Sequence, residues 1–399
     1  MHTLEDIESG ALTGARYVRL CQQGLTEFPR QLFSLADTLE ILDLSGNQLH
    51  SLPDDLPRLT RLRILFASNN PFSELPRVLG HCPQLEMVGF KSCQISHVPH
   101  DSLPARLRWL ILTDNRITEI PASLGHCQRL QKLMLSCNLL RDLPDLSTCQ
   151  QLELVRIACN QLSTVPATLL RIPTLAWIAL AGNLLTLHSE RLTLDARTHP
   201  VIPFSTLVID ELLGEGASGH IHHATHKETG QALALKIFKA ARTSDGSPLS
   251  ELAAGLAAGQ HPFLLTPLAH VSGHPENKLA MALPLLPPGY VNLAGPPSFE
   301  SCTRDVYASD TRFTPHTARR LLDCIRGAVD HLHAHGVLHG DLYAHNILWN
   351  PQTGDAILSD LGAAVCAHDL PLQLVTSLQA MEWRAFAHLQ AEVLMRCKP

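Results

Sequence analysis

Apolar residues recur at a fixed spacing through the first half of the chain. Leu39, Leu42 and Leu44 are followed by Asn47, and the same spacing returns six more times. Its last position is then occupied by Asn70, Cys93, Asn115, Asn138, Asn160 and Asn183, in steps of 22 or 23 residues. Apolar residues two apart predict a short strand, and a fixed period of this length predicts stacked units that bury one continuous core.

The asparagine positions are followed by an apolar-x-x-apolar-Pro run, which ends at Pro53 in one repeat and at Pro121 in another. Because proline stops a strand, each unit should contain a short parallel strand, a turn and an extended or short helical return. The pattern resembles a leucine-rich repeat array, which implies a solenoid with a parallel β horseshoe. We assign residues 1–190 to this domain, as about seven full repeats after a degenerate N-terminal cap, and residues 191–203 to a linker.

The concave face of such an array is formed by the residues that alternate outward between the repeat leucines. This column is largely apolar, although a column that faces solvent should be polar. Contiguous exposed apolar surface commonly marks an interaction site. We therefore expect this face to bind a protein substrate or regulator through Trp109, Trp177, Met87 and Met134. The alternatives are that another part of the same chain covers these residues, or that scattered exposed apolar residues are simply tolerated at these positions.

The pattern changes after residue 204, where strands and helices of ordinary length replace the repeats. Residues 232–237, which follow a turn at residues 228–230, are apolar except for Lys236, and this predicts a buried strand. Apolar residues from Ala318 to Leu332 follow a 3.6-residue period, which predicts a helix that begins at Thr314-Pro315 and ends at Gly336. The second half of the chain therefore predicts a domain of mixed strands and helices.

Residues 337–362, directly after this helix, contain two acids and an asparagine whose spacing is informative about function. Asp341 ends the run His-Gly-Asp, Asn346 follows five residues later, and Asp360 opens the run Asp-Leu-Gly. The stretch resembles the catalytic loop and the Asp-Phe-Gly element of protein kinases. The resemblance implies that Asp341 serves the acceptor hydroxyl and that Asn346 and Asp360 bind Mg²⁺ with the hard oxygen ligands that this ion prefers.

A glycine-rich stretch and a buried lysine extend the resemblance toward the start of the domain. Gly214, Gly216 and Gly219 match the kinase loop that closes over the phosphates of ATP, and Lys236 matches its phosphate-binding lysine. Glu251 is the acid expected to hold Lys236, on a helix that Ser247-Pro248 should cap and begin. The other residues expected at the ATP site are Ile221, Ala234 and Leu283.

Several features depart from the usual protein kinase pattern. Gly340 stands where many protein kinases have arginine, and no Ala-Pro-Glu run occurs in the sequence. Only about twenty residues separate Gly362 from a predicted helix at Glu382, so the activation segment is short and the C-terminal lobe is truncated. The acceptor therefore stays open between a protein hydroxyl, which we favour as Ser or Thr, and a small molecule. A non-catalytic scaffold that only binds nucleotide is a further alternative.

The amino-acid composition argues mainly against certain partners and classes of protein. The chain has 31 basic and 37 acidic side chains, so it has no charge field that would attract nucleic acid or an anionic membrane. No apolar stretch approaches the roughly 18 residues of a membrane span, and the first residues do not resemble a secretory signal. Eleven cysteines without a Cys-x-x-Cys pair argue against a zinc site or a disulfide framework. We expect a cytoplasmic protein.

The sequence thus predicts an α/β protein with two domains. A leucine-rich repeat solenoid is followed by a bilobal, protein-kinase-like α+β domain over residues 204–399, with its N-terminal lobe at 204–288 and its C-terminal lobe at 289–399. The resemblance implies an ATP-dependent protein kinase that uses Mg²⁺.

Overall fold

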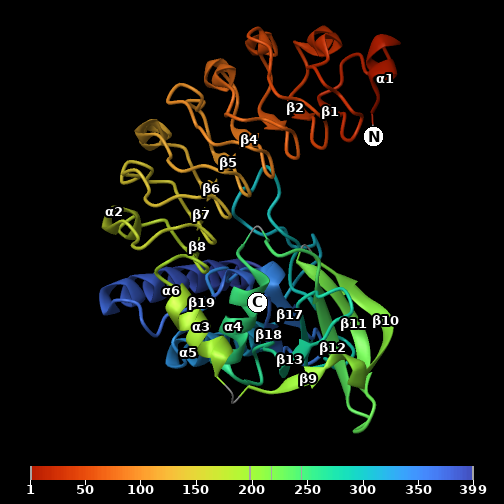
Figure 1. Cartoon of the computed structure of the whole chain (residues 1–399), viewed down its shortest axis with the longest axis vertical. Coiled ribbons are helices and arrows are strands. Elements are labelled where there is room, and N and C mark those ends of the chain that lie inside the picture. The colour runs from red at the N-terminus through yellow and green to blue at the C-terminus, as the bar shows by residue number, and fades with distance from the viewer. Residues whose placement is uncertain (1, 197–198, 217, 244, 398–399) are drawn as a thin grey trace. The chain divides into compact units, whose positions relative to one another are not determined.

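The computed structural model describes residues 2–196, 199–216, 218–243 and 245–397. These residues group into two compact units, Met1–Leu175 and Ala176–Pro399. Figure 1 shows the chain from its N-terminus in red to its C-terminus in blue. We describe each unit by itself.

Seven parallel strands pair in chain order through the first unit (Figure 1). Each has three residues and stands at the predicted place in its repeat. They are β1 (Tyr17–Arg19), β2 (Ile41–Asp43), β3 (Ile64–Phe66), β4 (Met87–Gly89), β5 (Trp109–Ile111), β6 (Lys132–Met134) and β7 (Leu154–Arg156). The returns contain the short helices η1 (Arg30–Leu35), η2 (Leu56–Arg58), η3 (Arg77–His81), η4 (Ala122–His126) and α2 (Ala167–Leu170), and α1 (Leu4–Glu8) precedes the first strand.

The asparagine column explains why the repeats stack. The Asn70 amide donates to the carbonyl oxygens of Leu44 and Ala67, each at 3.0 Å, and its side-chain oxygen accepts from the Leu49 amide at 2.9 Å. One buried side chain thus satisfies backbone groups of two successive repeats that would otherwise lack partners. The predicted leucine-rich repeat solenoid is confirmed.

The second unit begins with one more repeat strand and then forms an N-terminal lobe. β8 (Trp177–Ala179) and the helix α3 (Leu187–Asp195) come first. A six-stranded sheet follows in the order β10-β11-β12-β14-β13-β9. Its strands are β9 (Val201–Pro203), β10 (Leu207–Glu215), β11 (Gly219–His226), β12 (Ala232–Phe238), β13 (Ala269–Ser272) and β14 (Ala280–Leu283), with the turn η5 (Phe204–Thr206) between β9 and β10.

One helix covers the face of this sheet that carries the candidate site. The helix α4 (Pro248–Ala258) packs through Leu252 against Ala234, Phe238, Met281 and Leu283. The Ser247 hydroxyl caps it by accepting from the Ser250 amide at 3.0 Å, as predicted. The segment assigned to a linker is structured in part, because α3 continues to Asp195 and β9 pairs in parallel with β13.

The C-terminal lobe is built on two long helices. The helix α5 (Pro315–Ala334) buries the predicted apolar stripe, and α6 (Leu372–Leu394) follows near the end of the chain. The lobe also contains two small sheets. One consists of β15 (Val291–Asn292), which precedes α5, with β17 (Ile347–Trp349) and β18 (Ala356–Leu358), and the other of β16 (Val337–Leu338) and β19 (Val365–Cys366). The turns η6 (Ala344–Asn346) and η7 (Leu361–Ala363) complete the lobe.

The helix expected to begin near Glu382 begins ten residues earlier. α6 starts at Leu372, and Glu382 lies in its middle with the side chain buried. Residues 367–371 alone connect β19 to this helix. The activation segment is therefore even shorter than the sequence predicts, and the predicted bilobal fold is confirmed.

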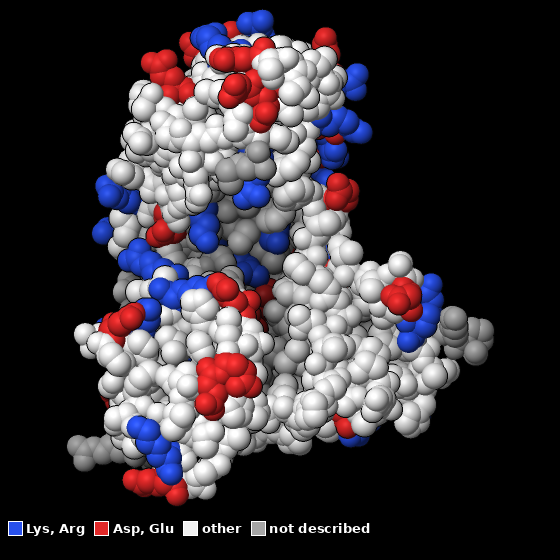
Figure 2. All heavy atoms as spheres, turned by 90° about the vertical axis from the view of Figure 1, so that its right-hand side faces the viewer, with Lys and Arg blue, Asp and Glu red and all other residues white. Residues whose placement is uncertain are grey.

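Charges of both signs occur on the face of the molecule that Figure 2 draws. Figure 2 shows acidic and basic side chains interspersed among large uncharged areas on the face that it draws. Among the residues that the structure describes, no helix combines the length and the apolar composition needed to cross a membrane.

A half-buried acid in the C-terminal lobe gives a first testable prediction. The Tyr307 hydroxyl donates to Glu392 Oε2 at 3.1 Å, and burial together with the nearby Asp305 charge raises the pKa of Glu392 from 4.5 to about 7. The unfolded chain therefore loses this proton first as the pH rises. The protonated Glu392 side chain therefore contributes to the free energy of unfolding below pH 4.5. This contribution should decrease as the pH rises from 4.5 to about 7, by at most about 3 kcal/mol in total.

Replacing Glu392 with glutamine should remove this pH dependence. We expect the variant to gain stability relative to wild type between pH 5 and pH 8, with little difference at about pH 4. Urea unfolding at a series of pH values measures the effect. A difference between the two proteins that stays constant with pH would contradict the raised pKa.

Candidate active site

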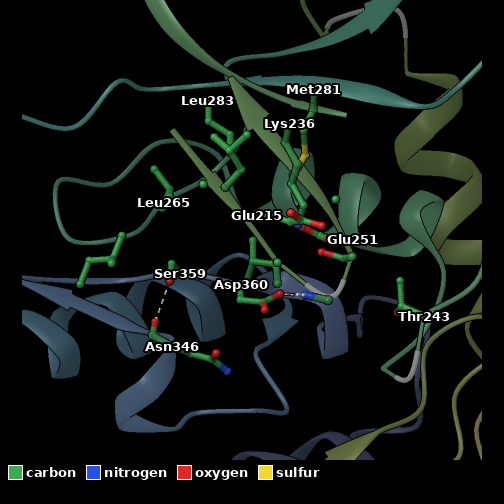
Figure 3. A pocket seen from close by; sticks show the side chains of 18 of the residues that line it. Glu215, Lys236, Thr243, Glu251, Leu265, Met281, Leu283, Asn346, Ser359 and Asp360 are labelled. Carbon is green, nitrogen blue, oxygen red and sulfur yellow. Dashed lines mark hydrogen bonds and ion pairs between the residues drawn. The ribbon is translucent and has the colours of Figure 1, made fainter. Parts of the chain in front are cut away.

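A cavity of about 480 Å³ lies between the lobes of the second unit. Figure 3 shows side chains of β12, α4 and β14 on one side of it and those of residues 346–360 on the other. Nine of the eleven residues expected to serve ATP, Mg²⁺ or catalysis line it: Gly214, Gly216, Gly219, Ile221, Lys236, Glu251, Leu283, Asn346 and Asp360. Asp341 lies next to Asn346 outside this lining, and Ala234 is buried on β12, where it pairs with Leu283.

The glycines of the β10–β11 hairpin differ in how much space surrounds them. A Cβ at Gly219 would meet the Ile237 carbonyl oxygen at 2.6 Å, so the packing of the sheet itself requires glycine there. A Cβ at Gly214 or Gly216 would meet nothing within 4 Å. Since the protein's own packing does not require these two glycines, they leave space for a ligand to approach the backbone.

The structure brings Lys236 and Glu251 together as a buried ion pair. Lys236 Nζ donates to Glu251 Oε1 at 2.5 Å, and the two residues are 7% and 3% exposed. Figure 3 shows the pair facing Asp360 across the cavity. Burial raises the pKa of the Glu251 carboxyl, the Asp360 charge adds to this effect, and the Lys236 ammonium opposes it. The two acids therefore hold the lysine in a negatively charged environment, where a phosphate would compete for its charge.

The backbone of the predicted catalytic loop is held by Glu382. Its Oε1 accepts from the amides of His339 at 2.6 Å and Gly340 at 2.9 Å, while Oε2 contacts His333 Nε2 at 2.6 Å. His339 Nε2 in turn contacts the Ser359 carbonyl oxygen at 2.9 Å. These bonds tie the loop to α6 and to the strand that ends at Asp360, which limits how far Asp341 can move.

Asn346 bonds to Asp341 and to Ser359, the residue that directly precedes Asp360. Its amide nitrogen donates to the carbonyl oxygen of Asp341 at 2.9 Å and to Asp341 Oδ2 at 3.1 Å. The backbone carbonyl oxygen of Asn346 accepts from the backbone amide of Ser359 at 2.9 Å and from the Ser359 hydroxyl at 2.8 Å. Because the amide nitrogen binds Asp341, the side-chain oxygen is the atom of Asn346 that suits a cation.

Asp360 adopts a left-handed backbone conformation with φ at 58°, and its Oδ1 accepts from the Gly362 amide at 3.1 Å. Non-glycine residues take this conformation rarely, and such positions cluster at functional sites. Its carboxylate and the Asn346 side-chain oxygen are hard donors from two neighbouring segments (Figure 3). This donor set fits Mg²⁺, which takes one or two protein oxygens and completes its shell with water and phosphate.

Other residues that line the cavity belong to no recognisable sequence motif, and the sequence analysis did not predict them. Met281 could have been found, because it shares a face of β14 with Leu283. Thr243 and Asp245 come from an irregular stretch between β12 and α4, and His345 comes from the catalytic loop. Nothing in the sequence marks the irregular stretch as part of a site, since its approach to the cavity depends on tertiary structure.

Gly340 is fixed by its surroundings. Its φ is 75°, and a Cβ would stand 2.5 Å from the Ile178 carbonyl oxygen and 2.8 Å from the Ala363 carbonyl oxygen. The arginine found here in many protein kinases therefore has no room in this fold. Control by an arginine that reads a phosphorylated activation loop is correspondingly absent at this position.

Replacing Gly340 with alanine should destabilise the second unit by more than the usual cost of a left-handed residue. That cost alone is about 1–2 kcal/mol, and the two backbone clashes add to it. Gly230→Ala is the matched control, because Gly230 has φ at 67° but open space around a Cβ. Thermal melts should show a clearly larger loss for Gly340→Ala, and equal losses would contradict the clash.

The prediction that Trp177 is an open partner anchor is wrong. The residue is 2% exposed, its indole nitrogen donates to the Leu342 carbonyl oxygen at 2.9 Å, and its ring stacks on Tyr343. Among the other three predicted anchors, Met87 and Met134 are buried. Trp109 is partly exposed, with its indole nitrogen 3.3 Å from the Met134 sulfur.

Comparisons with known proteins cover both parts of the chain. The family model "Protein kinase domain" matches residues 207–390, and two leucine-rich repeat models match residues 13–72 and 105–148. A leucine-rich repeat protein of Leptospira interrogans is similar in structure with a TM-score of 0.40 and 22% identity, over 48% of this chain and 55% of that one.

Curated relatives are protein kinases. The chain is 28% identical over 187 residues to the serine/threonine-protein kinase PITSLRE of Drosophila melanogaster, which covers 46% of this chain and 18% of the relative. It is also 28% identical over 169 residues to the cell division control protein 2 homolog D of Antirrhinum majus, over 42% of this chain and 52% of the relative. The match thus spans about half or less of the length of these relatives.

Proposed function

Because this chain is a leucine-rich repeat protein with a protein kinase domain, we propose that it transfers the γ-phosphate of ATP to a protein hydroxyl, on Ser or Thr. The observation that carries the proposal is the buried Lys236–Glu251 pair, at 2.5 Å, in one cavity with Asp360 and Asn346. A buried lysine paired to one acid and facing another is costly to maintain for stability alone. It is well suited to binding a triphosphate.

Each residue has a role that follows from its place. Lys236 binds the α- and β-phosphates, and Glu251 holds the lysine in position. Asn346 and Asp360 hold Mg²⁺, which would neutralise charge on the phosphates when bound. Asp341 accepts or orients the proton of the acceptor hydroxyl, and the amide of Asn346 fixes its carboxylate at 3.1 Å.

The remaining lining fits the adenosine part of ATP. Leu213, Leu265, Met281, Leu283 and Leu348 give the cavity apolar walls, and Ile221 adds to them. Flat aromatic bases bind well between such side chains, while the open backbone of Gly214 and Gly216 receives the phosphates. The prolines after Leu283 limit how many backbone amides can donate to the base.

A second candidate is a phosphotransferase that acts on a small molecule. The observation that favours it is the five-residue connection from β19 to α6, residues 367–371. This connection leaves little extended backbone on which a peptide could dock. The glycine-rich hairpin and the protein kinase match favour the first candidate.

The acceptor can be identified directly. Purified wild type is incubated with Mg²⁺ and ATP labelled at the γ-phosphate, with a Ser/Thr-rich protein, a panel of small alcohols, or aminoglycosides. We expect label on serine or threonine of the protein acceptor or of the enzyme itself. Label on a small alcohol or an aminoglycoside would replace the proposal with the second candidate. Nucleotide binding without transfer to any acceptor would instead indicate a non-catalytic scaffold.

For the repeats we propose recruitment of the substrate or of a regulator, which suits a location in the cytoplasm, where ATP is available. Of the predicted anchors, Trp109 is the partly exposed one and sits on β5, with the Lys132 ammonium 4.3 Å from its ring centre. A large ring next to a cation is a common interface anchor.

A further inference from the structure

The last repeat strand and the helix after it lie against both halves of the catalytic machinery. We propose that residues 176–195, here called the junction segment, are a positioning element of the phosphotransfer site. β8 sets the catalytic loop through Trp177, and α3 sets α4 through Glu190. The inference rests on the proposed function and extends it, because the family match begins only at residue 207.

β8 bonds to the residues on each side of Asp341. The Ile178 amide donates to the Gly340 carbonyl oxygen at 3.1 Å, and the Trp177 indole nitrogen donates to the Leu342 carbonyl oxygen at 2.9 Å. Two successive residues of one strand thus bond to the carbonyl groups of the residues on each side of the predicted catalytic acid. A rotation of Asp341 about its own backbone would break at least one of these bonds.

The Trp177 ring adds packing to these bonds. It stacks on Tyr343 with ring centres 4.2 Å apart and planes 10° apart. His388 of α6 stacks with it at 5.4 Å, and the Arg304 guanidinium lies 5.0 Å from its centre. Stacked aromatic pairs of this kind stabilise a structure beyond the effect of the area that they bury. The ring therefore fixes the second half of the loop, while Glu382 fixes the first half.

α3 bonds to the helix that carries Glu251. Glu190 Oε2 accepts from the Ser250 hydroxyl at 2.8 Å, and Oε1 accepts from the Gly182 amide at 2.8 Å. Ser250 directly precedes Glu251. Farther along, Leu194 packs against the cluster that contains Leu252 and Met281. α3 thus holds α4 in the position that closes the Lys236–Glu251 pair.

α4 needs such external support. It has eleven residues, and Gly255 stands in its interior, where a Cβ would meet Pro267 at 2.4 Å. A short helix with an internal glycine has low intrinsic stability. α3 also reaches the stretch after the Asp-Leu-Gly run, because the Ser189 hydroxyl donates to Asp369 Oδ2 at 2.9 Å. One segment therefore contacts the catalytic loop, α4 and the shortened activation segment.

The chemistry of Glu190 separates positioning from simple packing. The residue is 5% exposed and binds a hydroxyl and a backbone amide, both neutral donors. Burying a carboxylate with neutral donors costs stability compared with an apolar side chain of similar size. If α3 only covered α4, leucine at position 190 would stabilise the packing more than glutamate does. A carboxylate with two directional hydrogen bonds instead fixes Ser250 in one position.

The experiment uses the full chain and local hydrogen exchange. Trp177→Ala should speed exchange of amides in residues 339–346, and Glu190→Ala should speed exchange in residues 248–258. We expect Trp177→Ala to lower kcat about tenfold or more with the Mg·ADP affinity within about twofold of wild type. Glu190→Ala should weaken Mg·ADP binding about fivefold, because the Lys236–Glu251 pair opens.

Control variants separate these effects from general destabilisation. Trp177→Phe keeps a stacked ring and should restore most of the protection and of kcat. Leu192→Ala changes a residue of α3 that is 56% exposed, and Val271→Ala truncates a buried residue of the N-terminal sheet core. We expect neither control to speed exchange selectively in residues 339–346 or 248–258.

The proposal is overturned if Trp177→Ala and Glu190→Ala speed exchange uniformly, as a core truncation does, and leave nucleotide affinity and kcat at the level of Val271→Ala. Its failure differs from failure of the proposed function. If wild type transferred no phosphate, the exchange and Mg·ADP measurements would still decide whether the junction segment positions the loop and α4.

Discussion

Replacing Asp341 with asparagine should lower the rate of phosphate transfer about 10²- to 10⁴-fold, because the acceptor hydroxyl loses the carboxylate that takes or orients its proton. The substitution keeps the size of the side chain and its contact with the Asn346 amide, 3.1 Å away. We therefore expect the Mg·ADP affinity and the melting temperature to stay close to those of wild type. Steady-state ADP release measures the rate, and calorimetry measures the affinity.

Asp323→Asn is the matched control for this substitution. Asp323 lies exposed on α5, where it pairs only loosely with Arg319 at 3.9 Å. Its replacement should leave kcat unchanged. An Asp341→Asn protein with the kcat of the control would exclude Asp341 from the chemical step.

Replacing Lys236 with methionine should have the second-largest effect. Methionine fills the same space without the charge, so the triphosphate loses its ammonium partner and Glu251 loses the cation that opposes its raised pKa. Removing one partner of a buried pair costs about 3–5 kcal/mol of stability. We expect kcat/KM for ATP to fall at least about a hundredfold.

The double variant Lys236→Met with Glu251→Gln separates these two effects. It removes the unpaired buried carboxylate, so the stability lost in Lys236→Met should largely return. Phosphate transfer should not return, because the lysine is still absent. Recovery of activity together with stability would show that Lys236 acts only in folding.

The features that sequence predicted well are those with a local or periodic cause. The asparagine column repeats because each side chain must satisfy backbone groups of two neighbouring repeats, so its period is visible in one sequence. The stripe of α5 follows from burial of one helix face, and Ser247-Pro248 marked the start of α4 from local cap chemistry. The spacing of Asp341, Asn346 and Asp360 along the sequence was enough to predict that they belong to one site.

The features that it missed depend on contacts between distant segments. Trp177 stands in the column that alternates outward between the repeat leucines, and it contacts Leu342, which is 165 residues away along the chain, and Tyr343. Glu190 is the last residue of the stretch assigned to the repeats, where no sequence pattern marks it, and its bond to Ser250 spans 60 residues. The early start of α6 has a similar cause, because Leu374 and Leu378 become buried only when the lobe is folded. Single-sequence patterns cannot reveal these pairings.

The central claim is that the cavity around Lys236, Asn346 and Asp360 catalyses phosphate transfer from ATP. The most direct test is the Mg²⁺-dependent transfer of labelled γ-phosphate by purified wild type, with Asp360→Asn in parallel and the Ser/Thr-rich protein as acceptor. We predict label on protein for wild type with Mg²⁺, and none without Mg²⁺ or with Asp360→Asn. Wild type that binds Mg·ATP but transfers no label, or an Asp360→Asn protein as active as wild type, would contradict the claim.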